Sequence, residues 1–227
     1  MSAKIATIIG ATGLTGNHLV QLLQKDHTYE IIRLLVRRPI QTNGPKTEVK
    51  LIDFSDYESL RLGIEGSEAV FCAVGTTQKK VKGNKDDYRK VDYEIPLRAA
   101  RVCKDSGCEK FIIVSSVGAD PESRNFYLQL KGEVERDLKI SGVRSIHVMQ
   151  PGMLLGKRNE KRMLERGGQT VMKAFSRLMK GSLNKYRPIH SKEVAAAMLV
   201  CSRQDDPGFF VHQYDDMKRL SGMISVG

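Results

Sequence analysis

Residues 4–16, K-I-A-T-I-I-G-A-T-G-L-T-G, hold the stretch of sequence that decides the fold class. An apolar, β-branched run leads directly into three glycines spaced three residues apart, and a helical pattern over residues 15–25 follows. Gly10 permits a tight turn, Gly13 lets the backbone approach a pyrophosphate, and Gly16 lets the helix pack against the sheet. The strand–glycine–helix order predicts a dinucleotide-binding loop, with a purely structural turn as the alternative.

The same alternation of short apolar runs and longer amphipathic segments continues to the end of the chain. The predicted strands cover Lys4–Ile9, Ile31–Val36, Val49–Ile52, Ala69–Cys72, Lys110–Ser115 and Ser145–Met149, followed by short strands in R-P-I-H and G-F-F-V-H-Q-Y. The predicted helices cover Thr15–Lys25, Asp56–Leu62 with Asp56 as N-cap, Asp87–Lys104, Arg124–Ile140, a segment near Thr170–Lys180, and one that Ser191 opens. This pattern predicts an α/β protein with a doubly wound parallel (Rossmann) sheet.

We expect residues 1–227 to form a single NAD(P)-binding domain with a small C-terminal extension on the substrate side. Residues 151–190 would supply most of that substrate-side region, because they include a long polar, glycine-bearing segment beyond the sixth strand.

The second predicted strand ends in Arg37 and Arg38. Sites specific for NAD carry an acidic residue there, which binds the ribose 2′-hydroxyl. A carboxylate would repel a 2′-phosphate, whereas two guanidinium groups can pair with it. The pair therefore favours NADP(H) over NAD(H), unless both arginines are ordinary surface residues.

Further cofactor contacts follow from sheet topology. Asp53 and Phe54, after the third strand, are placed to border the adenine. Backbone on the ribose side would come from the residues after the fourth strand, which are Ala73, Val74, Gly75 and Thr76. Pro151 and Gly152 open the loop expected to meet the nicotinamide.

Tyr127 and Lys131 lie four residues apart on the predicted helix after the fifth strand, so they share one helical face. A nearby cation stabilises a phenolate, so Lys131 would make Tyr127 a usable proton donor to a carbonyl during hydride transfer. A serine at the end of the fifth strand could hold the carbonyl oxygen. Ser115 is preferred narrowly over Ser116, and a chance Y-x-x-x-K spacing is the alternative.

Five segments together resemble the atypical short-chain dehydrogenases/reductases, in the branch that includes the Tat-interacting protein of animal cells and its bacterial relatives. They are G-A-T-G-L-T-G, F-C-A-V-G-T-T, S-S-V-G-A-D, Y-L-Q-L-K-G-E-V-E and M-Q-P-G-M-L-L-G. By this resemblance the pyrophosphate would be held by Thr12, Gly13, Leu14 and Thr15, and the 2′-phosphate by Arg37 and Arg38. Tyr127 and Lys131 would be the catalytic and ribose-binding positions. Further cofactor contacts would come from Leu154 or Leu155 and from Arg158 or Arg162.

The chain has 37 Lys and Arg residues against 26 Asp and Glu residues, a formal net charge of +11. Part of this excess forms two clusters, Lys79, Lys80, Lys82 and Lys85, and Lys173, Arg177, Lys180, Lys185 and Arg187. We interpret both as solvated faces, because neither matches a nucleic-acid-binding motif. Nucleic acid is thus an unlikely partner, a membrane is not expected, and a protein partner or an oligomer stays open.

The four cysteines match neither the spacing of a zinc site nor a C-x-x-C redox pair, so we interpret them as reduced packing groups and expect no metal. They are Cys72, Cys103, Cys108 and Cys201. The amino terminus lacks the pattern of a signal peptide, and a cytoplasmic location is expected.

These observations favour an NADP(H)-dependent oxidoreductase that transfers hydride to a small carbonyl or quinone-like substrate. The alternative is an NADPH-binding redox-sensing or regulatory protein with little turnover. Only the enzyme requires Tyr127.

Overall fold

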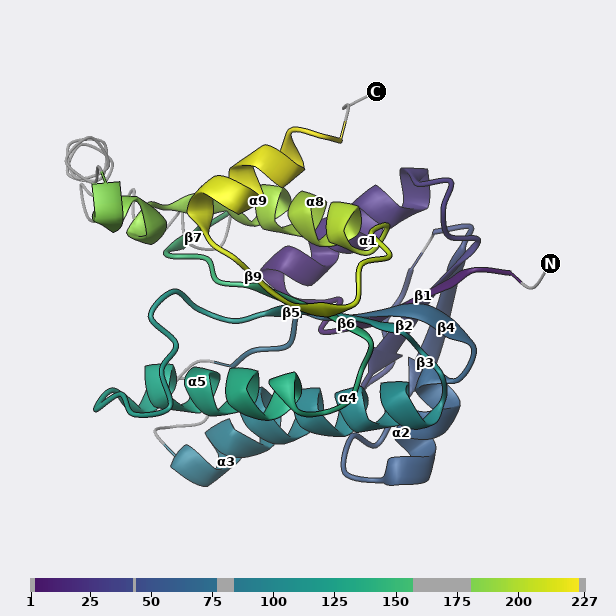
Figure 1. Ribbon diagram of the computed structural model, residues 1–227. Coiled ribbons are helices and arrows are strands. Elements are labelled where there is room, and N and C mark those ends of the chain that lie inside the picture. The colour runs from purple at the N-terminus through teal and green to yellow at the C-terminus, as the bar shows by residue number, and fades with distance from the viewer. Residues whose placement is uncertain (1–2, 43, 77–83, 157–180, 225–227) are drawn as a thin grey trace.

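The computed structural model describes residues 3–42, 44–76, 84–156 and 181–224. Its centre is a seven-stranded parallel sheet with the order β3-β2-β1-β4-β5-β6-β9 (Figure 1). The strands are β1 Ile5–Ile9, β2 Ile31–Val36, β3 Thr47–Leu51, β4 Ser67–Cys72, β5 Lys110–Val114, β6 Ser145–Met149 and β9 Gly208–His212. A small parallel pair, β7 Leu154–Leu155 and β8 Ile189–His190, lies beside it. The doubly wound Rossmann architecture is confirmed.

Helices cover both faces of the sheet. In Figure 1, α1, α8 and α9 lie on one face, and α2, α4 and α5 lie on the other. Their bounds are α1 Leu14–Lys25, α2 Tyr57–Ile64, α3 Lys85–Arg89, α4 Ile95–Asp105, α5 Phe126–Lys139, α8 Ser191–Cys201 and α9 Tyr214–Ser221. A π-helical turn, Lys90–Glu94, joins α3 to α4, and a 3-10 helix covers Gly181–Tyr186. None of the described helices is both long and apolar enough to cross a membrane.

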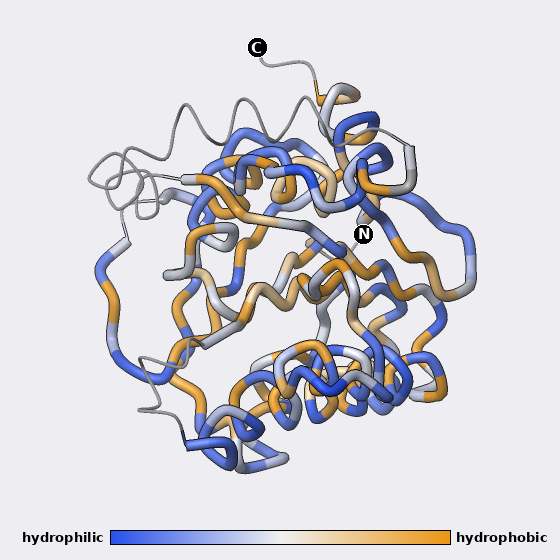
Figure 2. The backbone as a smooth tube through the Cα atoms, turned by 90° about the vertical axis from the view of Figure 1, so that its left-hand side faces the viewer, coloured by the Kyte–Doolittle hydropathy of each residue, from blue (hydrophilic) through white to orange (hydrophobic). Residues whose placement is uncertain are grey.

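Each face of the sheet has its own apolar core. Alternate residues of a strand point to opposite faces, so Ile8 and Met149 pack under α1 and α8, whereas Ile9 and Val148 pack over α2 and α4. Figure 2 shows the strands of the central layer as largely hydrophobic, and the lower helices alternating between polar and apolar residues. Burial on both faces explains why the central strands are continuous apolar runs.

The predicted elements agree closely with the observed ones in the sheet and less closely in the helices. Asp56 is the N-cap of α2, where its carboxylate accepts a hydrogen bond from the backbone N–H of Ser59. The predicted continuous helix Asp87–Lys104 is instead α3, the π-helical turn and α4. Helix α9 was not predicted, and the predicted helix near Thr170–Lys180 lies outside the described residues.

Candidate functional site

A cleft of about 610 Å³ lies at the carboxyl ends of β1, β2 and β4, where the strand order reverses. Ligands of doubly wound sheets bind at this topological switch point. The cleft brings together many of the residues predicted to contact the cofactor, which are Gly10, Thr12, Gly13, Arg37, Arg38, Phe54, Ala73, Val74, Gly75 and Thr76. Residues from four separate chain segments therefore meet in one concave surface.

The glycine loop has no room for side chains at its two ends. Gly10 has a φ of +89°, and a Cβ there would lie 2.7 Å from the backbone of Ala73 and Val74. A Cβ on Gly16 would overlap the Gly10 carbonyl. The Gly13 N–H donates to the Gly10 oxygen at 2.9 Å, and Gly13 is the N-cap of α1. The loop therefore turns tightly from β1 and directs the first amides of α1 toward the cleft.

Three arginines of the β2 region differ in their surroundings. Arg33, within the strand, donates to the Glu48 carboxylate at 2.7 Å and to the Glu65 carbonyl at 2.8 Å. Arg37 and Arg38, beyond the end of the strand, are exposed and line the cleft. Arg33 thus holds the sheet to α2, whereas the other two guanidinium groups face the ligand space.

Asp53 lies beside this cleft rather than in it. With Phe54 it lines a second, more open depression of about 800 Å³ that shares Arg37 with the first. Its carboxylate accepts hydrogen bonds from the backbone N–H and the hydroxyl of Ser55, which lower the Asp53 pKa. Asp53 therefore borders the expected adenine end with a firmly ionised group.

Lys131 forms a buried ion pair with Asp92, a residue of the π-helical turn. The Lys131 Nζ lies 2.9 Å from the Asp92 Oδ1, and the two side chains are 5% and 1% exposed. Burial lowers the pKa of Lys131, but the interactions with Asp92 and Tyr127 together outweigh it, so the net effect raises that pKa. The same ammonium lies 5.9 Å from the centroid of the Tyr127 ring. The predicted Tyr127–Lys131 pair therefore has a third, anionic member.

Two contacts connect this group to the end of β4. Asp92 accepts a hydrogen bond from the Thr76 backbone N–H at 2.8 Å, and the Tyr88 hydroxyl donates to the Thr76 carbonyl at 3.1 Å. The ring of Tyr88 packs edge-to-face on that of Tyr127. Thr76 lines the cleft and Tyr127 and Lys131 do not, so these contacts connect the tyrosine and lysine to the edge of the cleft.

Ser115 lies at the end of β5 and is nearly buried, and its hydroxyl donates to the Glu135 carboxylate. Gln150 also donates to Glu135, at 2.9 Å, and accepts from the Gln213 amide at 3.0 Å. Burial raises the Glu135 pKa. The Ser116 hydroxyl has a weaker contact, 3.4 Å to the Val117 carbonyl. Ser115 thus belongs to a buried polar network that sequence reasoning missed.

The loop after β6 lies against the glycine loop. Gly156 is so close to Leu14 that a Cβ there would lie 2.7 Å from the Leu14 side chain. Earlier in this loop, the Pro151 carbonyl accepts from the Val117 N–H at 3.0 Å, and Gly152 packs on the backbone of Tyr186. Leu154 and Leu155 form β7. Arg158, Arg162 and most of residues 151–190 lie outside the described residues.

Sequence reasoning missed Asp92, Glu135 and Gln150, and the sequence around Asp92 alone contains a pattern that could have revealed its role. Tyr88, Asp92, Ile95 and Ala99 are spaced four, three and four residues apart and are all buried. A carboxylate on such an apolar stripe requires a partner, which is a hint of function. Glu135 and Gln150 offer no comparable pattern, because their partners come from distant segments.

Those members of the two basic clusters that the structure describes lie against aromatic rings. Lys85 lies over the Phe126 ring at 5.2 Å, and Arg187 lies over the Tyr214 ring at 4.9 Å. Lys185 likewise lies 5.4 Å from the Tyr186 ring centroid. The other members lie outside the described residues and are Lys79, Lys80, Lys82, Lys173, Arg177 and Lys180.

The family described as NAD(P)H-binding matches residues 10–201. This chain belongs to that family. It is 32% identical over 193 residues to "Protein FMP52, mitochondrial" of Debaryomyces hansenii, covering 84% of each chain. It is 33% identical over 167 residues to "Protein HTATIP2" of Rattus norvegicus, covering 71% of this chain and 67% of the relative. The resemblance to atypical short-chain dehydrogenases/reductases is confirmed.

Solved structures show the same fold at low identity. MoeE5 in complex with UDP-glucuronic acid and NAD has a TM-score of 0.68 and 18% identity, covering 92% of this chain and 75% of that one. Uronate dehydrogenase from Agrobacterium tumefaciens has a TM-score of 0.68 and 16% identity, with 93% and 76% covered. The family match identifies an NAD(P)H-binding protein, and the solved structures agree with its Rossmann fold.

The expected cytoplasmic location is wrong on the comparison with relatives. The FMP52 proteins of Debaryomyces hansenii, Saccharomyces cerevisiae and Candida albicans are all named as mitochondrial. The amino-terminal pattern on which that expectation rested does not distinguish the cytosol from an organelle.

Proposed function

We propose that the protein is an NADP(H)-dependent reductase that transfers hydride to a small carbonyl or quinone-like substrate. One observation carries the proposal: the Tyr127–Lys131–Asp92 group is joined through Thr76 to the cleft that holds the glycine loop and the exposed Arg37 and Arg38. The contact between Asp92 and Thr76 supports a role for this group beside the bound cofactor.

The preference for NADP(H) rests on the end of β2. Exposed guanidinium groups at this position can form charge-assisted hydrogen bonds with a 2′-phosphate. The residues after β2 are Arg37, Arg38 and Pro39, so no carboxylate stands where NAD sites place one. The glycine loop fits a pyrophosphate, because the close approach of Gly10 to Ala73 leaves backbone rather than side chains at that position.

When bound, the nicotinamide supplies a hydride to the substrate carbon. Tyr127 gives the proton from its hydroxyl to the substrate oxygen, so the reduced product gains one hydride and one proton. Lys131 stabilises the resulting phenolate and holds the ribose. Ser115 positions the oxygen after its hydroxyl turns away from Glu135, and Ser116 is the alternative donor.

A second candidate is an NADPH-binding regulatory protein with little turnover, and the Asp92 carboxylate favours it. A negative charge 2.9 Å from the Lys131 ammonium opposes the stabilisation that this ammonium gives to a phenolate. Such a protein would need the cleft but not the Tyr127 hydroxyl.

The test is a screen of aldehydes, ketones and quinones with NADPH, using the parent protein and Tyr127→Phe. We expect turnover by the parent and a loss of about 10²–10⁴-fold in the variant, the range for general acid catalysis. Tyr57→Phe is the matched control, because its hydroxyl donates to Asp105, the last residue of α4, and neither residue lines the cleft. NADPH binding without turnover in the parent would favour the regulatory candidate, and equal turnover in parent and Tyr127→Phe would contradict the assigned proton donor.

We also infer a mitochondrial location, on the names of the FMP52 relatives. Fractionation of cells that express the full chain with a C-terminal tag should recover it with a matrix or membrane marker of mitochondria. Recovery with a cytosolic marker alone would contradict this inference.

A further inference from the structure

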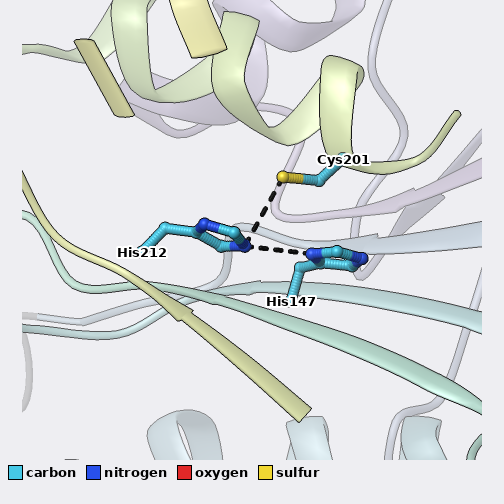
Figure 3. Close-up of side chains that lie close together, drawn as sticks. All are labelled: His147, Cys201 and His212. Carbon is cyan, nitrogen blue, oxygen red and sulfur yellow. Dashed lines mark hydrogen bonds between the residues drawn. The ribbon is translucent and has the colours of Figure 1, made fainter. Parts of the chain in front are cut away.

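Two histidines and a cysteine converge beneath α8 (Figure 3), and none of them lines the nucleotide cleft. His147 comes from β6, His212 from the end of β9, and Cys201 from the last residue of α8. The His147 Nδ1 lies 3.0 Å from the His212 Nε2, which lies 3.6 Å from the Cys201 Sγ. All three donor atoms lie within 4.8 Å of one another.

The surroundings prepare His147 to offer a lone pair toward this cluster. The Ser145 hydroxyl donates to the Asp206 carbonyl at 2.9 Å, so it can only accept from the His147 Nε2, 3.3 Å away. A neutral His147 therefore carries its proton on Nε2 and its lone pair on Nδ1. A fixed outer nitrogen of this kind is the usual support of a metal-binding histidine.

We propose that His147, Cys201 and His212 bind one metal ion that prefers thiolate and imidazole ligands, Zn²⁺ or Cu⁺. Around a tetrahedral Zn²⁺, with bonds of about 2.0–2.3 Å, donor atoms lie about 3.3–3.6 Å apart. The two distances at His212 are already close to this spacing. The remaining adjustment is an approach of the Cys201 Sγ and the His147 Nδ1, which lie within 4.8 Å of each other.

The proton balance of binding is simple. His147 gives a lone pair without losing a proton, and His212 moves its proton from Nε2 to Nδ1 so that Nε2 is free. Cys201 loses its thiol proton to solvent and binds as thiolate, so one proton is released for each ion bound. His212 is half-buried, which leaves a side from which the ion and a water ligand can enter.

The two candidate ions differ in the charge they leave behind. With one thiolate, Cu⁺ gives a neutral three-coordinate site, whereas Zn²⁺ leaves one positive charge and takes water as a fourth ligand. The charged groups facing the cluster are mixed, with Asp216 and Arg219 near His212 and Lys110 near His147. Binding of both ions must therefore be measured.

The experiment uses the full chain after removal of metal by a chelator. Zn²⁺ is titrated in competition with a chromophoric chelator, and Cu⁺ is titrated under a reductant with a Cu⁺-selective chelator. We expect one equivalent of one of these ions to bind, and Cys201→Ser to weaken binding by at least about tenfold. Cys103→Ser is the matched control, because Cys103 is equally buried but lies in the opposite core.

A second measurement needs no variant of the buried core. Co²⁺ bound to the parent protein should show a thiolate-to-cobalt charge-transfer band in the near ultraviolet, and His212→Gln should weaken Co²⁺ binding. The proposal is overturned if neither Zn²⁺ nor Cu⁺ binds to the parent, if Cys103→Ser weakens binding as much as Cys201→Ser, or if bound Co²⁺ shows no thiolate band.

Discussion

The nucleotide cleft and the His147–Cys201–His212 cluster are built in opposite ways. Gly10, Gly13 and Gly16 follow one another within seven residues, and Arg37 and Arg38 are adjacent. The cluster instead joins residues that are 54 and 11 positions apart along the chain, on a strand and a helix end followed by an edge strand. A site made from one local turn leaves a motif in the sequence, whereas a site assembled by sheet order leaves none.

The proposed catalytic group beside the cleft combines a local motif with a long-range contact. Tyr127 and Lys131 share one helix, but the partner of Lys131, Asp92, comes from another segment. The comparison therefore predicts that variants of Asp92 disturb the cleft by breaking a long-range contact, that variants of the glycine loop disturb it locally, and that variants of the cluster leave cofactor binding intact.

The largest expected effect is that of Asp92→Asn. Removing one member of a buried ion pair leaves the other charge uncompensated, which costs about 3–5 kcal/mol. In the parent, Lys131 is protonated below pH 10.5 in both states, because its pKa is 10.5 in the unfolded chain and higher in the folded protein. Lys131 therefore adds no pH dependence to the stability of the parent in that range. Urea unfolding of the two proteins at pH 7 measures the loss.

The direction in which the stability of Asp92→Asn changes with pH distinguishes the loss of the Asp92 charge from a loss of packing. Without Asp92, burial alone acts and the Lys131 pKa falls, so the folded variant binds fewer protons than the unfolded chain. Its free energy of unfolding should then rise as the pH rises toward 10. An equal loss of stability at pH 7 and pH 10 would contradict the role of Asp92.

A smaller effect is expected for Gly10→Ala. The added Cβ would lie 2.7 Å from the backbone of Ala73 and Val74, so the loop must shift. Loss of one backbone hydrogen bond to a charged phosphate costs about 1.5–3 kcal/mol, so NADPH affinity, measured by fluorescence, should fall by about 10–10²-fold. Gly107→Ala is the control, because its φ of +72° is similar but no atom lies within 4 Å of the added Cβ. Equal losses in both variants would show that backbone strain alone is responsible.

The smallest effect is expected for Cys201→Ser in metal-free protein. The variant should lose about 1 kcal/mol of stability, because a hydroxyl replaces a buried thiol. Its NADPH affinity should match that of the parent, since Cys201 does not line the cleft. Fluorescence titration with NADPH checks this prediction. A clear loss of affinity would show that the cluster and the nucleotide cleft are not independent.

The sequence predictions were accurate where burial is uniform along an element. Ile31–Val36 and Ser145–Met149 have the predicted bounds, because both strands are buried nearly throughout. The edge strand β3 begins two residues earlier than expected, since Thr47 and Glu48 are only half-buried and show no continuous apolar run. Helix α9 was missed because only Met217 and Leu220 of its eight residues are buried.

The residues of the candidate site also differ in how visible they are in the sequence. The glycine loop, Arg37, Arg38 and the Tyr127–Lys131 spacing are visible locally. The contacts of Lys131 with Asp92 and of Ser115 with Glu135 depend on which segments the sheet brings together. The cysteines were interpreted as packing groups because spacing along the chain was the only criterion, and Cys201 meets its histidines only through β6 and β9.

The most direct test of the central claim is the affinity of NADPH and NADH for the parent, for Arg37→Ala/Arg38→Ala and for Arg101→Ala. Arg101 is the control because it is exposed on α4 and does not line the cleft. We predict that the parent prefers NADPH, and that the double variant loses NADPH affinity by at least about tenfold while NADH affinity changes little. Equal losses for the two cofactors, or a parent that prefers NADH, would contradict the account.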